Sequence, residues 1–463
     1  MEFCKPSFFL FFVPVLLIYW RLRSHGLRMG WLLAASLLYY ALFNPWFILL
    51  MFASTGIDFV VARRLPSLTC PNRRWWLVAA CITINLSLLA TFKYLLFALH
   101  SANWLAGWFG GGFEVPGWQL ILPLGISFYT FEAISYVVDV YRGRVQPFTS
   151  LRDYLLYILF FPHLLAGPIV RSHDFGPQLL RPKRFSWLRF EAGVQLFLLG
   201  AFKKAVLADW MATIVDPVFQ APGDYASTAL WTASLAYSVQ IYGDFSGYSD
   251  MAIGLAHLLG FKLPANFRTP YLSASLGEFW RRWHISLSNW LRDYLYIPLG
   301  GSRGGTIATC RNLLLTMTLG GLWHGASWTF VLWGVYHGLL LAFARVVPVP
   351  AWAVARWTRP LWVALTFLCV TVGWVLFRAS SFADAATVLR GMLWPTSGVC
   401  VPTEHAAMVL AGLLALFVGG LIDGRKLAAR LPMPVAAAGL AGFAALYLAL
   451  LPQRASGFIY FHF

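Results

Sequence analysis

Long apolar runs follow one another along almost the whole chain, separated by short polar or basic stretches. Such runs predict membrane helices, because a helix needs roughly 20 apolar residues to cross a bilayer. Several runs are shorter than this and are predicted as half-helices or re-entrant segments covered by protein. We expect about 9 to 12 true spans. The predicted helices cover residues 6–20, 29–43, 45–61, 75–99, 119–140, 152–170, 187–209, 225–242, 249–261, 313–322, 326–344, 359–378, 405–422 and 433–451.

Composition supports a membrane protein. Of the 463 residues, 59% are hydrophobic and only 11% are charged, whereas about a quarter of a soluble domain is charged. We therefore predict an all-α polytopic membrane protein in which residues 1–463 form one integral-membrane domain. The first apolar run is followed by Arg21 and Arg23 instead of a small-residue cleavage site, so it is predicted to be an anchor and not a cleaved signal peptide.

The positive charge of the chain fits membrane loops better than nucleic acid. Lys and Arg outnumber Asp and Glu by 35 to 18, for a net charge of +17. Cytoplasmic loops collect such residues, and anionic lipid headgroups attract them. No basic stretch resembles a nucleic-acid-binding module. We predict that the polar stretches 171–186 and 262–311 are cytoplasmic and that the second lies against the bilayer surface.

His324 is the first candidate for a chemical role. It lies in the sequence Gly320–Gly325, inside the run 312–344 that contains no charged residue. A titratable group at bilayer depth is costly and usually functional. A single helix over this run would be about 50 Å long and exceed the roughly 30 Å core, so the glycines predict a break beside a polar cavity or tunnel. The alternative is a packing histidine, which is the favoured interpretation for His337.

The segment 278–293 is predicted to be one amphipathic helix in which Glu278 pairs with an arginine three or four residues later. One interpretation is that His284 points into the protein while arginines bind the phosphates of a cytosolic donor, because a guanidinium can bond two oxygens at once. The other is an interfacial helix with a tryptophan belt and snorkelling arginines. The candidate donor-binding residues are Arg281, Arg282, Arg292, Lys203 and Lys204.

Asp244 and Asp250 border two predicted helices. A buried carboxylate needs a partner, so either one could orient a histidine, pair with an arginine, or belong to a structural ion pair. The histidines and carboxylates show no metal-binding spacing, and no metal site is predicted. The six cysteines indicate neither a disulfide framework nor a zinc site. Hydrolase, ATPase and dehydrogenase motifs are also missing from the sequence.

Several motifs together resemble the membrane-bound O-acyltransferases, specifically the bacterial alginate O-acetyltransferase type. The likeness runs mainly from about residue 120 to 345 and includes the C-terminal sequence 457–463. The motifs are Pro123–Phe131 with Asp139–Arg142, Phe161–Pro168, Asp244–Gly254, Glu278–Arg303 and Asn312–Gly325.

The resemblance implies a helical membrane fold with a funnel leading to a central tunnel. It implies two functional histidines, His284 and His324, with possible support from Asp244, Trp283 and Trp323. It also implies acyl transfer from a thioester to a hydroxyl, with acetyl-CoA as the donor substrate and no permanently bound cofactor. The acetyl group would cross the bacterial inner membrane and reach an exported polysaccharide or peptidoglycan through a periplasmic acetyltransferase partner and the polysaccharide-synthesis machinery.

The chemistry of histidine fits that reaction. A hydroxyl is a weak nucleophile at neutral pH and needs a base, a role that a neutral imidazole can perform. We assign His324 as the base, and we expect His284 to orient the donor, stabilise the oxyanion or relay a proton. One alternative is D-alanyl transfer to teichoic acid from a carrier-protein thioester, although the sequence Trp280–Arg303 favours acetyl. The other is a non-enzymatic polysaccharide or lipid transporter, which would predict internal repeats that the sequence lacks.

Overall fold

The computed structural model describes residues 3–118, 120–165, 167–347, 355, 357–421, 439, 442 and 445. These residues form helices and no strand, with one isolated bridge between Tyr225 and Val399. The predicted all-α fold is therefore confirmed. The chain divides into two compact units: the first comprises Met1–Val194 and Ala252–Pro264, and the second comprises Gln195–Met251 and Ala265–Phe463. The single membrane domain stays a prediction.

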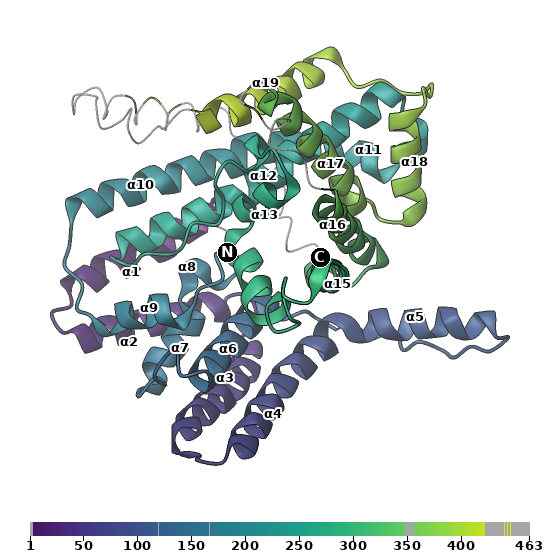
Figure 1. The fold of residues 1–463 in the computed structure, drawn as a ribbon. Helices are drawn as coiled ribbons and strands as arrows, with labels where there is room; N and C mark the ends of the chain where they lie inside the picture. Colours follow the sequence, from purple (N-terminus) through teal and green to yellow (C-terminus); the bar gives the residue numbers. More distant parts are fainter. Residues whose placement is uncertain are drawn as a thin grey trace. The chain divides into compact units, whose positions relative to one another are not determined.

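Two helices of the first unit begin with a proline. Pro6 and Pro71 occupy the first turns of α1 and α4, where proline fits because the first helical N–H groups have no partner within the helix. A π-helical turn, Ala90–Tyr94, joins α4 to α5, and α3 packs beside α4 (Figure 1). The helices are α1 (Pro6–Arg21), α2 (His25–Ala41), α3 (Phe47–Arg64), α4 (Pro71–Leu89), α5 (Leu95–Trp108), α6 (Ile126–Tyr141), α7 (Leu151–Leu159), α8 (Phe161–Leu164) and α9 (Ser172–Leu180).

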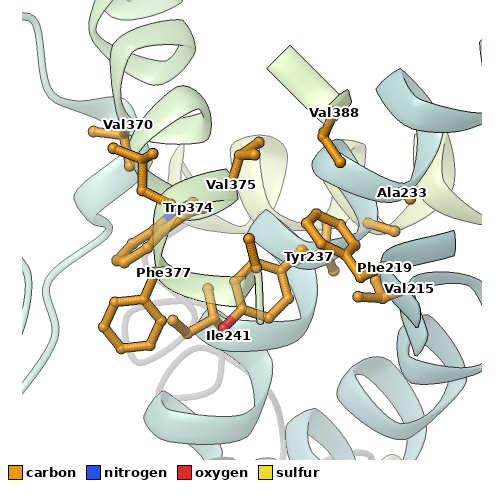
Figure 2. Packing of buried hydrophobic residues seen from close by; sticks show 14 of the residues in the cluster. Val215, Phe219, Ala233, Tyr237, Ile241, Val370, Trp374, Val375, Phe377 and Val388 are labelled. Carbon is orange, nitrogen blue, oxygen red and sulfur yellow. The ribbon is translucent and has the colours of Figure 1, made fainter. Parts of the chain in front are cut away.

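The second unit is organised around a large apolar core. Phe219 and Tyr237 from one part of the chain pack in the same cluster as Trp374 and Phe377 from another (Figure 2). Full burial of one such side chain contributes roughly 1.5–3 kcal/mol, so this cluster fixes the frame that carries the site. The helices are α11 (Asp209–Gln220), α13 (Leu276–Arg282), α14 (Ile285–Leu291), α15 (Gly305–His324), α16 (Trp328–Val346), α17 (Arg359–Arg378), α18 (Phe382–Leu393) and α19 (Thr403–Leu421). Helices α10 (Trp187–Phe202) and α12 (Ser227–Leu258) contribute residues to both units.

Helices α15 and α16 form an antiparallel hairpin whose backbones approach very closely (Figure 1). A Cβ added at Gly321 would overlap with the carbonyl oxygen of Phe330, and one at Gly334 would overlap with that of Met317. Gly338 lies one turn after Gly334 and faces the backbone of Leu314. Small residues spaced by four are typical of helix pairs that associate in membranes. The glycines therefore set the spacing of the hairpin that carries His324.

The hydrophobic pattern predicted some boundaries correctly and others not. Helix α17 covers the predicted range 359–378, and the predicted break in the run 312–344 falls at Gly325. The two predicted helices 225–242 and 249–261 are wrong, because α12 continues through both. The single helix 278–293 is also wrong, because the chain turns at His284 between α13 and α14. The predicted helix 433–451 and the sequence 457–463 lie outside the described residues, apart from the isolated positions 439, 442 and 445.

Three helical segments among the described residues are long and apolar enough to cross a membrane. They are Pro71–Trp108, which joins α4 and α5, together with α16 and α17. The shorter apolar helices Pro6–Arg21 and Thr403–Gly419 are further candidates for partial spans. These segments support a membrane protein, while the expected total of about 9 to 12 spans stays a prediction.

Candidate active site

His324 is the last residue of α15, at the turn of the α15–α16 hairpin. Gly325 follows it in an extended conformation, and a Cβ at that position would overlap with the ring of Phe330. Helix α16 then begins after Ser327, whose side-chain oxygen accepts a hydrogen bond from the backbone N–H of Thr329 at 3.2 Å. The glycine and the serine cap together hold the turn, so the position of His324 is determined by the local sequence.

The imidazole of His324 lies among aromatic rings and is only 4% exposed. Its ring centroid is 5.1 Å from that of Trp323, 5.2 Å from that of Trp333 and 5.3 Å from that of Phe377, all in edge-to-face geometry. Such contacts orient a ring through its quadrupole. His324 is therefore enclosed by protein, as a functional histidine in a membrane protein should be.

His284 has a strained backbone and a buried side chain. Its φ and ψ of 42° and 54° are left-handed, which is unusual for a residue with a side chain. It caps α14, because its Nδ1 accepts a hydrogen bond from the N–H of Leu287 at 3.4 Å. The neutral ring therefore carries its proton on Nε2, a buried atom that has no hydrogen-bond partner among the described residues. Burial lowers the pKa of His284 to about 3, so the ring is uncharged at neutral pH.

Asn266 stabilises the strained turn at His284 by accepting hydrogen bonds from the two residues that follow it. Its backbone carbonyl accepts a hydrogen bond from the N–H of Ile285 at 2.9 Å. Its side-chain Oδ1 accepts two more from Ser286, one from the N–H at 3.2 Å and one from Oγ at 2.9 Å. Its Nδ2 donates to Oγ of Ser249 on α12 at 3.2 Å. A left-handed residue costs about 1–2 kcal/mol and persists only where its surroundings determine the conformation, often at functional sites.

The turn brings His284 next to His324. Their ring centroids lie 6.3 Å apart with an interplanar angle of 69°. Phe245 of α12 packs against His284 at a centroid distance of 4.5 Å, and Trp323 lies 6.1 Å from it. Two buried imidazoles at this separation can both reach one small polar group. This arrangement suits proton transfer combined with stabilisation of a developing negative charge.

Comparison with known proteins shows the family to which the chain with this histidine pair belongs. The sequence pattern of the membrane-bound O-acyltransferase family matches residues 144–382, which include both histidines. The probable alginate O-acetylase of Pseudomonas aeruginosa is 41% identical over 429 residues, covering 90% of this chain and 81% of its own length. The chain belongs to the membrane-bound O-acyltransferase family. It is therefore an O-acyltransferase, and the alternative of a non-enzymatic transporter is wrong.

Two further relatives differ in how similar they are to this acyltransferase. The peptidoglycan O-acetyltransferase of Helicobacter pylori is 38% identical, covering 84% of this chain and 79% of its own length. The teichoic acid D-alanyltransferase of Bacillus subtilis is 28% identical, covering 58% of this chain and 71% of its own length. The similarity to the two O-acetylating relatives is therefore both higher and more extensive.

Asp244 of the acyltransferase forms an ion pair with a lysine. A structural ion pair was one of the three interpretations of this residue that the sequence left open. Nζ of Lys204 lies 2.8 Å from a carboxylate oxygen of Asp244 and 2.8 Å from one of Asp209. Lys203 pairs with Asp250 at 2.7 Å. Both ammonium groups are held by carboxylates, and these contacts do not favour phosphate binding, which stays a prediction. The ion pairs anchor the stretch of α12 that presents Phe245 to His284.

The candidate arginines of the segment 278–293 do not lie on one continuous helix, because the chain turns between α13 and α14. Arg281 is exposed on α13, whereas Arg292 follows α14 and pairs with Asp293 at 2.8 Å. The predicted pair of Glu278 with Arg282 is confirmed at 2.6 Å. Partial burial alone would raise the pKa of Glu278, but the N–H of Ala274 and the charges of Arg282 and Arg359 lower it overall. Phosphate binding by these arginines stays a prediction.

Trp283 and His337 complete the surroundings of the pair. Trp283 belongs to the apolar core and lies 4.9 Å from Trp374, so it anchors the turn that carries His284. His337 is fully buried on α16 and packs against Trp280 at 5.2 Å and Trp333 at 5.0 Å. These contacts agree with the packing interpretation of His337.

The hydrophobic pattern missed Asn266, Ser249 and Phe245. Asn266 lies in a loop without helical periodicity, and its partners come from α12 and α14. No spacing rule connects positions that meet only through the tertiary fold. The available signal was a lone asparagine between the apolar residues Ala265 and Phe267, and a polar side chain in such a place needs hydrogen-bond partners when it is buried.

Proposed function

We propose that this acyltransferase takes acetyl from acetyl-CoA on the cytosolic side of the bacterial inner membrane, as a multi-pass protein, and passes it across for O-acetylation of an exported polysaccharide or peptidoglycan. A periplasmic acetyltransferase and the polysaccharide-synthesis machinery would be its partners. The observation that carries the proposal is the buried pair of His284 and His324, 6.3 Å apart. Identity to relatives named for alginate and peptidoglycan O-acetylation supports acetyl as the group transferred.

In the proposed reaction His324 acts as the general base. Its imidazole accepts the proton of the acceptor hydroxyl while that oxygen attacks the carbonyl carbon of the thioester. A carbon–oxygen bond forms, and collapse of the tetrahedral intermediate breaks the carbon–sulfur bond. The leaving thiolate receives the proton from His324, so the products are an ester and free CoA thiol. General-base assistance of this kind contributes a factor of about 10² to 10⁴ in rate.

His284 is proposed to stabilise the oxyanion. Its Nε2–H is the available donor of the ring, since Nδ1 accepts from Leu287. A fixed donor costs no reorganisation when charge develops, and such a hydrogen bond is worth about 2.7–4 kcal/mol in other acyl-transfer enzymes. The strained turn and the clamp by Asn266 keep the ring orientation fixed. A proton relay between the two rings is the alternative role for His284.

Acetate on the exported polymer tests the proposed function. Cells that produce only the His324→Ala or only the His284→Ala variant are expected to export polymer without alkali-releasable acetate, while the protein still inserts into the membrane. The control is His100→Gln, because His100 is an exposed histidine on α5. Normal acetate release with His324→Ala would refute the base assignment.

The choice of donor requires a separate assay. Teichoic acid D-alanylation from a carrier-protein thioester is the second candidate, supported by 28% identity over 58% of the chain. The purified acyltransferase is expected to release CoA thiol from acetyl-CoA and to leave a D-alanyl carrier-protein thioester intact. The reverse pattern would replace the acetyl proposal with the D-alanyl alternative.

A further inference from the structure

A cavity of about 770 Å³ lies in the second unit, beside α17. Its volume is within the range of small-molecule and cofactor sites, about 300–1,000 Å³. Its lining contains neither His284 nor His324. The lining residues are Leu235, Thr269, Leu272, Arg282, Arg359, Pro360, Val363, Ala364, Phe367, Leu368, Thr371 and Phe417.

One end of the cavity carries an excess of positive charge. Arg282 and Arg359 both contact the same carboxylate oxygen of Glu278, at 2.6 Å and 3.2 Å. Arg282 also donates to Oγ1 of Thr269 at 3.3 Å, and Arg359 donates to the carbonyl of Leu272 at 3.4 Å. Two guanidinium groups share one carboxylate, so one positive charge is left. Both arginine side chains are partly exposed, at 31% and 47%, and can accept an anion from the cavity or the membrane surface.

The rest of the cavity is apolar and follows a membrane helix. From Arg359 to Thr371 the lining runs along α17, one of the helices able to cross a bilayer. Twelve residues of helix rise about 18 Å, slightly more than the roughly 15 Å depth of one leaflet of a 30 Å core. At the inner end the hydroxyl of Thr371 lies 3.2 Å from that of Ser238. The cavity is therefore basic where α17 begins, and its apolar lining extends to about the middle of that helix.

We propose that this cavity binds one anionic phospholipid. The phosphate would contact Arg282 and Arg359, since guanidinium groups bind phosphate through two parallel hydrogen bonds. One acyl chain would lie along Val363 and Phe367 towards Thr371. Basic pockets between membrane helices bind anionic headgroups in this way. Acetyl-CoA shares the phosphate chemistry, but its thioester would have to reach His324, and this cavity is lined by neither histidine.

Thermal unfolding of the purified full-length protein in detergent tests the proposal. Phosphatidylglycerol, added in mixed micelles, is expected to raise Tm by several degrees, whereas phosphatidylcholine with the same acyl chains should leave Tm unchanged. Arg359→Gln removes a phosphate contact and should abolish the rise. Val363→Trp fills the apolar part without changing the charge and should also abolish it. Arg345→Gln is the matched control, because Arg345 is an exposed arginine at the end of α16.

Three results would overturn the lipid site. The first is an equal Tm rise with both lipids, and the second is a full rise in Arg359→Gln. The third is a full rise with inorganic phosphate or CoA alone, which would mean that the arginines bind phosphate without any acyl chain. Retention of phosphatidylglycerol in native mass spectrometry, lost in Arg359→Gln and kept in Arg345→Gln, provides a second readout. Neither measurement depends on acetyl transfer, so the outcome is separate from that of the proposed function.

Discussion

Oδ1 of Asn266 accepts two hydrogen bonds from Ser286, at 3.2 Å from the backbone N–H and at 2.9 Å from the hydroxyl. Ser286 is two residues after His284, whose backbone is left-handed. The contact fixes the start of α14 and thereby the direction in which the imidazole of His284 points. A loop residue outside the histidine pair is therefore expected to control the geometry of the site.

Asn266→Ala is predicted to lower kcat by about 10- to 100-fold with little change in KM for acetyl-CoA, because a misplacement of about 1 Å can cost that much. Steady-state CoA thiol release measures both constants. Asn266→Asp keeps the acceptor for Ser286 and should recover part of the activity. A KM rise with an unchanged kcat would assign Asn266 to substrate binding and not to positioning.

The stability of the acyltransferase is predicted to fall at acidic pH, in part through His284. Burial depresses the folded pKa of His284 to about 3, below the unfolded value of about 6.5. The unfolded state therefore binds more protons between these values, and this contribution to stability, complete above about pH 6.5, is lost progressively as pH falls towards 3. At pH 5 the loss is about 2 kcal/mol.

The pH dependence of Tm in detergent checks this contribution. His284→Gln cannot titrate, so the decrease in Tm between pH 7 and pH 5 should be smaller in this variant than in the wild type. The control His100→Gln should follow the wild-type curve. Parallel curves for His284→Gln and wild type would show that His284 does not carry this proton linkage.

The α15–α16 hairpin is predicted to be intolerant of side chains at its glycines. Gly334→Ala places a methyl group against the carbonyl oxygen of Met317, and overpacking of this kind costs typically about 1–3 kcal/mol. Gly30→Ala on α2 is the matched control, because nothing lies within 4 Å of its added Cβ. A lower Tm for the first variant and an unchanged or higher Tm for the second are expected. Equal values would contradict the close helix contact.

Lys204→Met is predicted to destabilise the protein by about 3–5 kcal/mol, because it leaves the buried Asp209 and Asp244 without their cation. Lys203→Met should cost less, because Lys203 and Asp250 are both partly exposed. Where enough folded Lys204→Met protein survives, its affinity for CoA should be unchanged. A large loss of CoA affinity without a change in Tm would instead support the predicted donor-binding role of the lysines.

The sequence was most informative where a local rule determines the structure. His324 was recognisable because a titratable residue in an uncharged apolar run is unusual, and the break at Gly325 followed from the length of the run and its glycines. Helix α17 was predicted in full because its apolar run is continuous and long enough to cross a bilayer. These features depend on neighbours along the chain.

The remaining features depend on residues far apart in sequence. Asp244 and Asp250 suggested a gap between two helices, but each carboxylate is paired with a lysine, so α12 continues through them. The segment 278–293 has helical periodicity, yet Asn266 holds its centre in a turn at His284. Hydrophobic periodicity does not reveal an ion pair or a hydrogen bond supplied by another segment of the chain. Both errors, the gap in α12 and the single helix 278–293, occurred where another segment supplies such a contact.

The proposed reaction depends above all on removal of the acceptor hydroxyl's proton by His324. The most direct measurement is the rate of acetyl transfer from acetyl-CoA by purified acyltransferase, followed as CoA thiol release, for wild type, His324→Ala and the control His100→Gln. We expect a loss of about 10² to 10⁴ in rate for His324→Ala and a wild-type rate for the control. A wild-type rate in folded His324→Ala would contradict the role of His324 as the base.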